Sequence, residues 1–160
     1  MSKIIFNESI LDPVQKTRCR DVFDENDIVR SEVKSYIEDT FYKWYNELDY
    51  KPFKIMGFKL IGSSTGYQYT DISDIDVQVY CDVEPGIDPI PYFKKLFRQL
   101  PNGNMLPGTQ HPINYFQVDA NDPPADIKVE NRYDMATNVW EKKSDAREIG
   151  IPIQYVRNVA

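Results

Sequence analysis

The sequence predicts an α+β fold in which a mixed β-sheet is flanked by helices. Three observations support this class. The 160 residues, 41% of them hydrophobic, suit one domain with a working core. An amphipathic helix pattern stands near the start, and short apolar runs with strand character follow it. We therefore expect residues 1–160 to form a single domain, with an irregular lead-in over residues 1–25 and a C-terminal extension over residues 141–160.

The first element is a helix predicted over residues 27–48. Apolar residues recur there at intervals of three and four, which places them on one helical face. Asp27 or Ser31 is expected to cap its start, and Pro52 ends it because proline lacks the backbone donor. The positions on this face are Val29, Val33, Ile37, Phe41, Trp44 and Leu48.

The remaining elements follow in order. Residues 53–61 form an apolar strand, residues 63–73 a turn with a short helix or loop, and residues 75–80 an alternating strand. A second helix is predicted over residues 92–100 and a loop over residues 101–107. Strands are then expected at 113–118 and 127–129, separated by a turn at 120–124, before a hairpin over 133–140 around residues 136–138.

Charge and cysteine content narrow the function classes. The net charge is -6, whereas proteins that grip long nucleic acid carry a basic face, so no long nucleic-acid groove is expected. Two cysteines do not form a disulfide framework. No apolar run approaches the roughly 20 residues of a membrane span, and the start lacks a signal peptide pattern. A cytoplasmic protein without membrane contact is expected.

A glycine-serine bend follows the first predicted strand. Gly62 permits close approach of the backbone to a ligand. Ser63 and Ser64 offer hydroxyl groups, and the amides of the bend can point at a phosphate. This segment is the predicted nucleotide-binding part of the site.

Two carboxylates begin the next strand. Asp74 and Asp76 are two residues apart, so a strand directs both to the same side. Two parallel carboxylates repel each other unless a cation lies between them. Oxygen ligands of this kind suit Mg²⁺, and two such ions would stabilise the attacking and leaving oxygens of phosphoryl transfer. Alone, the pair would also be compatible with a solvated edge strand.

Taken together, Gly62-Ser63 and Ser73-Asp74-Ile75-Asp76-Val77 resemble the signature of the DNA polymerase beta nucleotidyltransferase superfamily. The resemblance implies a minimal polymerase beta-type fold, binding of ATP or another nucleoside triphosphate (NTP) near the glycine-serine bend, and two Mg²⁺ ions held by the aspartates. A nucleotidyl group would pass to a hydroxyl with release of pyrophosphate. The acceptor stays open among an RNA end, a small molecule and a protein.

Further segments are similar to small bacteriophage-encoded predicted nucleotidyltransferases, which implies the host cytoplasm as the location. They cover most of the chain, although only the central motif is specific. These segments are residues 11–13, the helix after residues 24–26, residues 62–67, residues 111–116 and residues 133–140.

The superfamily implies a third acidic residue on a neighbouring strand, and three positions compete for it. Asp126 lies in a segment that resembles the strand with the third aspartate, and it is our principal candidate for a catalytic and metal-binding group. The phage group instead points to the strand after His111, where this sequence has Asn114. Asn114 offers a carbonyl oxygen to a metal but is a poor base. Asp119 is the remaining alternative.

His111 is the sole histidine. We expect its ring to bond to backbone, or else to contact the nucleotide or its acceptor. A zinc role is not expected, because one histidine and two distant cysteines do not complete four ligands.

Three functions therefore compete. The first is a Mg²⁺-dependent nucleotidyltransferase. The second is a catalytically weak nucleotide- or protein-binding regulator that keeps the fold, which Asn114 would favour. The third is an interaction protein with a coincidental motif, which would gain no stability from Mg²⁺ and nucleotide.

Overall fold

A computed structural model describes residues 14–51, 53–88, 90–91, 94, 97–123 and 129–145. The described part is mixed α/β, in agreement with the predicted α+β class. Its named elements are α2 (Ser31–Tyr45), β1 (Phe53–Ile61), the 3-10 helix η1 (Ser63–Thr65), β2 (Ile75–Val83), the 3-10 helix η2 (Phe97–Gln99), β3 (Asn104–Met105), β4 (Pro112–Asp119), β5 (Arg132–Asp134) and β6 (Val139–Lys142).

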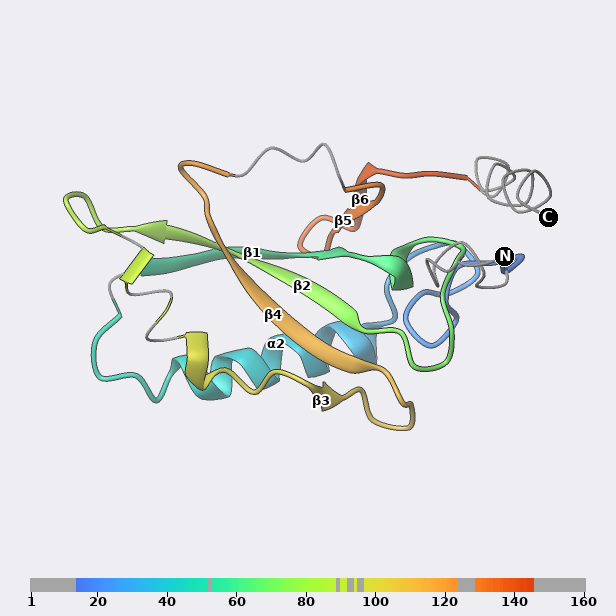
Figure 1. The fold of residues 1–160 in the computed structure, drawn as a ribbon, viewed down its shortest axis with the longest axis horizontal. Helices are drawn as coiled ribbons and strands as arrows, with labels where there is room; N and C mark the ends of the chain where they lie inside the picture. Colours follow the sequence, from blue (N-terminus) through green and yellow to red (C-terminus); the bar gives the residue numbers. More distant parts are fainter. Residues whose placement is uncertain are drawn as a thin grey trace, which may run out of the picture.

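The strands form a six-stranded mixed sheet in the order β3-β4-β2-β1-β5-β6 (Figure 1). Strands β2 and β4 pair in parallel, and the other neighbours pair antiparallel. Because β1 runs against β2 and β4, the end of β1 and the starts of β2 and β4 meet at one edge of the sheet. This edge carries the candidate functional site.

Helix α2 begins one turn later than predicted, and its capping differs from the prediction. Arg30 is the N-cap residue and makes no side-chain cap bond. The prediction of Asp27 or Ser31 as the cap is therefore wrong. Asp27 lies outside the helix in a left-handed conformation (φ 60°), where its carboxylate pairs with the Arg18 guanidinium instead.

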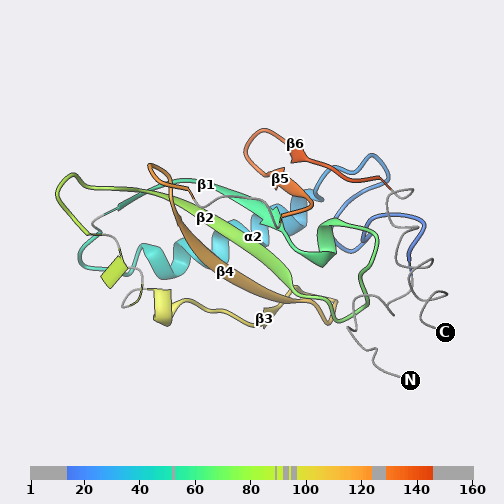
Figure 2. The same ribbon diagram turned by 45° about the horizontal axis from the view of Figure 1, so that its top comes forward.

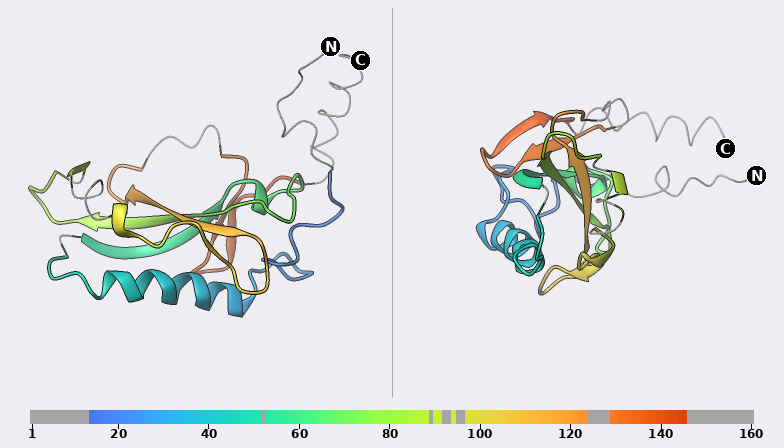
Figure 3. Two further views of the ribbon diagram at one scale, coloured as in Figure 1. Left: turned by 60° about the horizontal axis from the view of Figure 1, so that its bottom comes forward. Right: turned by 90° about the vertical axis from the view of Figure 1, so that its left-hand side faces the viewer.

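The core lies between α2 and one face of the sheet (Figure 3). The Tyr115 hydroxyl on β4 donates to the Ile37 carbonyl on α2 at 2.7 Å, and the Phe41 ring packs 5.2 Å from that of Phe58 on β1. Side chains alternate along a strand, so Asp76 and Asn114 face away from this helix. The burial of Val33, Ile37 and Phe41 confirms the predicted apolar stripe.

The strand predictions agree well within the described residues. β1 has the predicted bounds, and β2 continues three residues beyond its predicted end. The predicted hairpin is formed by β5 and β6, which lie beyond β1 (Figure 2). The short strand β3 was not predicted, because it lies within the Gly/Pro/Asn-rich segment assigned to a loop.

Several predictions lie partly outside the described residues. Of the helix expected over 92–100, Lys94 is helical and Phe97–Gln99 forms η2. Of the strand expected over 127–129, residues 127 and 128 lie outside. Much of the lead-in and of the C-terminal extension also falls there. The described part of the lead-in is irregular, with an isolated bridge between Phe23 and Val29.

Candidate functional site

The sheet register brings the predicted site residues together. Ile61 pairs with Asp76 across β1 and β2, and Asp76 pairs with Asn114 across β2 and β4. Gly62, which follows Ile61 directly, therefore lies beside the Asp76 side chain. The glycine-serine bend and the aspartate pair are neighbours in space, although ten residues separate Ser63 from Asp74 in the sequence.

Gly62 is required here for two independent reasons. Its backbone has φ 89° and ψ -177°, a combination that is essentially restricted to glycine. A Cβ atom at this position would also lie 2.5 Å from Asp76 Oδ2, closer than side chains approach. The Gly62 backbone therefore lies directly against the Asp76 carboxylate, with no room for a side chain between them.

The two carboxylates differ in environment. Asp74 is exposed and accepts a hydrogen bond from Asn114 Nδ2 at 3.1 Å. Asp76 is half-buried, and its pKa is raised from the ordinary value. Burial is the main cause, and the Asp74 charge adds to it, whereas the hydrogen bond from Asn114 lowers the pKa. Both effects that raise the pKa would be offset by a cation between the two groups.

The hydroxyl groups of the bend differ in access. Ser63 is exposed, whereas Ser64 is only 1% exposed. Ser63 therefore offers the hydroxyl that a ligand from solvent can reach, and the Ser64 side chain packs inside. Thr65 is also buried, and its amide donates to the Gly62 carbonyl at 3.0 Å, which closes the turn of η1.

A buried arginine, Arg18, forms hydrogen bonds to η1 and to the segment that follows it. Arg18 Nε donates to the Thr65 carbonyl at 3.0 Å, and Arg18 Nη1 donates to the Tyr67 hydroxyl at 2.7 Å. The guanidinium also lies 4.5 Å from the centre of the Trp140 ring, and its partner carboxylate is that of Asp27 at 3.4 Å. These contacts link the bend to the segment before α2 and to the β5–β6 hairpin.

The three candidates for the third acidic position have different outcomes. Asp126 lies outside the described residues. Asn114 occupies the position beside the aspartate pair. Asp119 pairs with Cys81, five residues along β4 from Asn114, which corresponds to roughly 16 Å along a strand. Asp119 is therefore too far from Asp76 to share a metal ion, and that alternative is wrong.

His111 is fully buried and forms a network that the sequence did not reveal. Its Nδ1 lies 2.8 Å from the Ser73 carbonyl oxygen, which confirms the expected bond to backbone. Its Nε2 lies 2.9 Å from Asp21 Oδ2 and 3.7 Å from Cys19 Sγ. The potential ligand atoms of Cys19, Asp21 and His111 all lie within 4.8 Å of one another.

This cluster differs from the aspartate pair in chemistry. Cys19 is buried and its pKa is raised, mainly by burial. Asp21 has half of its side chain exposed. Asp21 was not among the residues expected near His111, because histidine and cysteine alone were counted as zinc ligands. The one available signal was the Cys19-Arg20-Asp21 spacing, which is too common to be informative alone.

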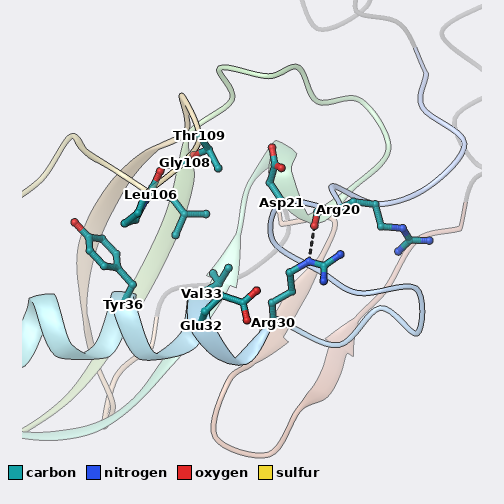
Figure 4. A pocket seen from close by; sticks show the side chains of 10 residues that line it. Arg20, Asp21, Arg30, Glu32, Val33, Tyr36, Leu106, Gly108 and Thr109 are labelled. Atoms are coloured by element: carbon teal, nitrogen blue, oxygen red, sulfur yellow. Dashed lines mark hydrogen bonds between the residues drawn. The ribbon is translucent and has the colours of Figure 1, made fainter.

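A pocket of about 410 Å³ opens beside Asp21. Asp21 and Thr109, which come from different loops, both line it (Figure 4). Arg30 lies at its wall, where its Nε donates to the Arg20 carbonyl at 2.6 Å. Of the Cys19, Asp21 and His111 cluster, Asp21 is the member that lines this pocket.

In the described part of the chain, no helix is long and apolar enough to cross a membrane. A scan against protein-family models, a search of curated proteins and a search of solved structures found no match.

Proposed function

We propose that this protein is a Mg²⁺-dependent nucleotidyltransferase that moves a nucleoside monophosphate from an NTP to a hydroxyl acceptor. The observation that carries the proposal is the close approach of Gly62 to the Asp76 carboxylate. Asp74 lies nearby, because it accepts a hydrogen bond from Asn114, the residue that pairs with Asp76. A bend that only glycine can make thus lies against the Asp76 carboxylate, two residues from the exposed Asp74. The finer assignment to a minimal polymerase beta-type fold rests on the same arrangement.

The donor set suits Mg²⁺. Asp74 and Asp76 are oxygen ligands, and burial together with mutual repulsion disfavours the ionised pair when no cation is near. Divalent ions bound there would supply charge neutralisation at the transferring phosphoryl group. Asp74 and Asp76 would hold the metal, and Gly62 and the exposed Ser63 would bind the phosphate tail.

A specific observation favours a second function. Asn114 lies where a third acidic group would be expected, and its amide donates to Asp74. An amide is a poor base, so a site without a further carboxylate would bind nucleotide and transfer it weakly. The protein would then act as a nucleotide- or protein-binding regulator. Both proposed functions use the aspartate pair to bind metal, and they differ in how fast the nucleotidyl group is transferred.

The test uses radiolabelled NTPs with Mg²⁺ or Mn²⁺, and it measures labelling of the protein itself, of RNA and of host lysate. The nucleotidyltransferase proposal expects labelling that falls to background in Asp74→Asn and Asp76→Asn. Asp82→Asn is the matched control, because Asp82 lies on the same strand but bonds to Asn121 at its other end. NTP binding by calorimetry without any labelling supports the regulator, and the absence of both refutes the two proposals.

Two less central assignments follow. We propose a cytoplasmic location, which the two free cysteines, Cys19 and Cys81, support. The negative net charge supports an NTP and a compact hydroxyl acceptor as partners, rather than a long nucleic acid.

A further inference from the structure

The Cys19, Asp21 and His111 cluster joins two segments that are far apart in the sequence. Cys19 and Asp21 belong to the segment before α2, and His111 lies directly before β4. Through its other ring nitrogen, His111 reaches the carbonyl of Ser73, the residue before Asp74. The cluster therefore lies beside the aspartate pair but shares no side chain with it.

The hydrogen-bond pattern of His111 leaves one conflict. Nδ1 faces a carbonyl oxygen, which can only accept, so Nδ1 carries the proton. In a neutral ring, Nε2 then presents a lone pair to Asp21 Oδ2 at 2.9 Å, where both atoms are acceptors. Only a second proton on the ring, a proton on Asp21 or a cation at this point removes the conflict.

The thiol of Cys19 favours a cation. A protonated ring would be satisfied by Asp21 alone, yet the buried sulfur also lies 3.7 Å from the same nitrogen. A bond from Nδ1 to a backbone carbonyl is the usual partner of a histidine that binds metal through Nε2, because it fixes the tautomer and the ring orientation. The three ligand atoms thus lie within 4.8 Å of one another, and the histidine already has its supporting bond.

We propose that Cys19 Sγ, His111 Nε2 and an Asp21 carboxylate oxygen form a site for a divalent metal of the zinc class, with water as the fourth ligand. Sulfur and nitrogen ligands select zinc over magnesium. In a tetrahedral zinc site, sulfur and nitrogen ligands lie about 3.5 Å apart, close to the observed 3.7 Å. Nitrogen and oxygen ligands lie about 3.3 Å apart, more than the observed 2.9 Å, so the half-exposed Asp21 side chain must move away from the ring to make room for the ion.

The proposed ion would act as a staple. Metal binding contributes directly to folding free energy, because the unfolded chain does not hold the ligands together. Here it would tie the segment before α2 to the start of β4. The bond from His111 to the Ser73 carbonyl would then hold the residue that precedes Asp74. The water position would open toward the pocket beside Asp21.

The experiment is a cobalt titration of the full chain after treatment with a chelator. Co²⁺ takes the place of Zn²⁺ and gives a thiolate-to-metal absorption band when a cysteine binds it. We expect one equivalent of Co²⁺ to produce this band and Zn²⁺ to abolish it. Elemental analysis of protein purified with added zinc should then find one zinc per chain.

Five variants separate the proposed ligands from other effects. Cys19→Ser should lose the band, whereas Cys81→Ser, at the other buried free cysteine, should keep it. Asp21→Asn changes a half-exposed group that the fold tolerates, and it should weaken Co²⁺ binding at least about tenfold. Asp74→Asn and Asp76→Asn should keep the band, so this proposal and the nucleotidyltransferase proposal fail independently.

Other outcomes would overturn the proposal. If folded wild-type protein gives no cobalt band and retains no zinc, the cluster is only an imidazolium–aspartate pair beside a thiol. A band that disappears in Cys81→Ser but survives in Cys19→Ser would place the metal elsewhere. Unchanged affinity in Asp21→Asn would exclude the carboxylate from the site.

Discussion

Replacing Gly62 by alanine tests the contact on which the proposed function depends. The substitution has two separate costs. The backbone conformation, with φ 89° and ψ -177°, disfavours any side chain by about 1–3 kcal/mol. In addition, the new Cβ would lie 2.5 Å from Asp76 Oδ2, whereas real Cβ atoms keep about 3.0 Å, so the carboxylate must retreat by about 0.5 Å.

These two costs predict different consequences. Because Asp76 Oδ2 is the end of a side chain that can turn away, relieving the clash should add only about 1 kcal/mol, the low end for overpacking, so the total destabilisation should reach about 2–4 kcal/mol. For a chain of this size each kcal/mol lowers the Tm by about 2–4 °C. A displacement of about 0.5 Å is also the limit of productive site geometry, so Mn²⁺ binding at Asp76 should weaken as well.

Two other glycines provide controls. Gly103 also has a positive φ, 79°, but a Cβ there would meet nothing within 4 Å. Gly103→Ala should therefore show only the backbone cost, and Mn²⁺ binding should be unchanged. Gly57→Ala has neither a positive φ nor a close neighbour, so it should be nearly neutral.

The assay combines thermal unfolding with Mn²⁺ titration by calorimetry. A double-mutant cycle with Asp76→Ala isolates the contact, since removing the carboxylate should relieve the clash but keep the backbone strain. The reasoning is refuted if Gly62→Ala and Gly103→Ala lose equal stability, if both bind Mn²⁺ like wild type, or if the cycle shows no coupling between Gly62 and Asp76.

Three further predictions concern neighbouring residues. Asp76→Asn should raise the Tm at neutral pH without divalent cations and abolish stabilisation by Mg²⁺. Because the pKa of Asp76 is raised in the folded state, wild-type stability falls as the pH rises from about 3.8 through that folded pKa. In thermal scans, the higher Tm of Asp76→Asn should therefore disappear below about pH 4. Asn114→Asp should lower the metal-free Tm, because three carboxylates then meet, and increase the rise in Tm that Mn²⁺ produces; an unchanged response would argue against Asn114 at the metal position. Arg18→Met should cost about 1–3 kcal/mol in urea unfolding, because it leaves the buried Thr65 carbonyl without its donor while Asp27 keeps the Lys143 ammonium at 3.5 Å; a loss below about 0.5 kcal/mol would contradict that role.

The sequence was sufficient for elements whose pattern is local. The four-residue spacing of Val33, Ile37 and Phe41 indicated the buried face of α2, and the mostly apolar nine-residue segment indicated β1. Helix capping was not predictable in this way. Asp27 has the residue type of a cap, but its carboxylate is taken by Arg18, a tertiary contact that no local pattern encodes.

The candidate site was predictable in part because its main residues share one strand and one bend. Asp74 and Asp76 are two residues apart, and a strand directs such residues to the same side. The neighbour from β4 was harder to identify, since it depends on the register between β2 and β4. That register places Asn114 opposite Asp76 and moves Asp119 to the far end of the strand.

The Cys19, Asp21 and His111 cluster shows why nonlocal sites escape sequence analysis. His111 follows Asp21 by 90 positions, and only the packing of the segment before α2 onto the start of β4 brings them together. A search for zinc ligands that counts only cysteines and histidines leaves out the carboxylates, most of which are ordinary surface groups. Asp21 differs because it meets a buried imidazole whose other nitrogen is already committed to the Ser73 carbonyl. The bonding state of the histidine, more than its residue type, makes this cluster a candidate for metal binding.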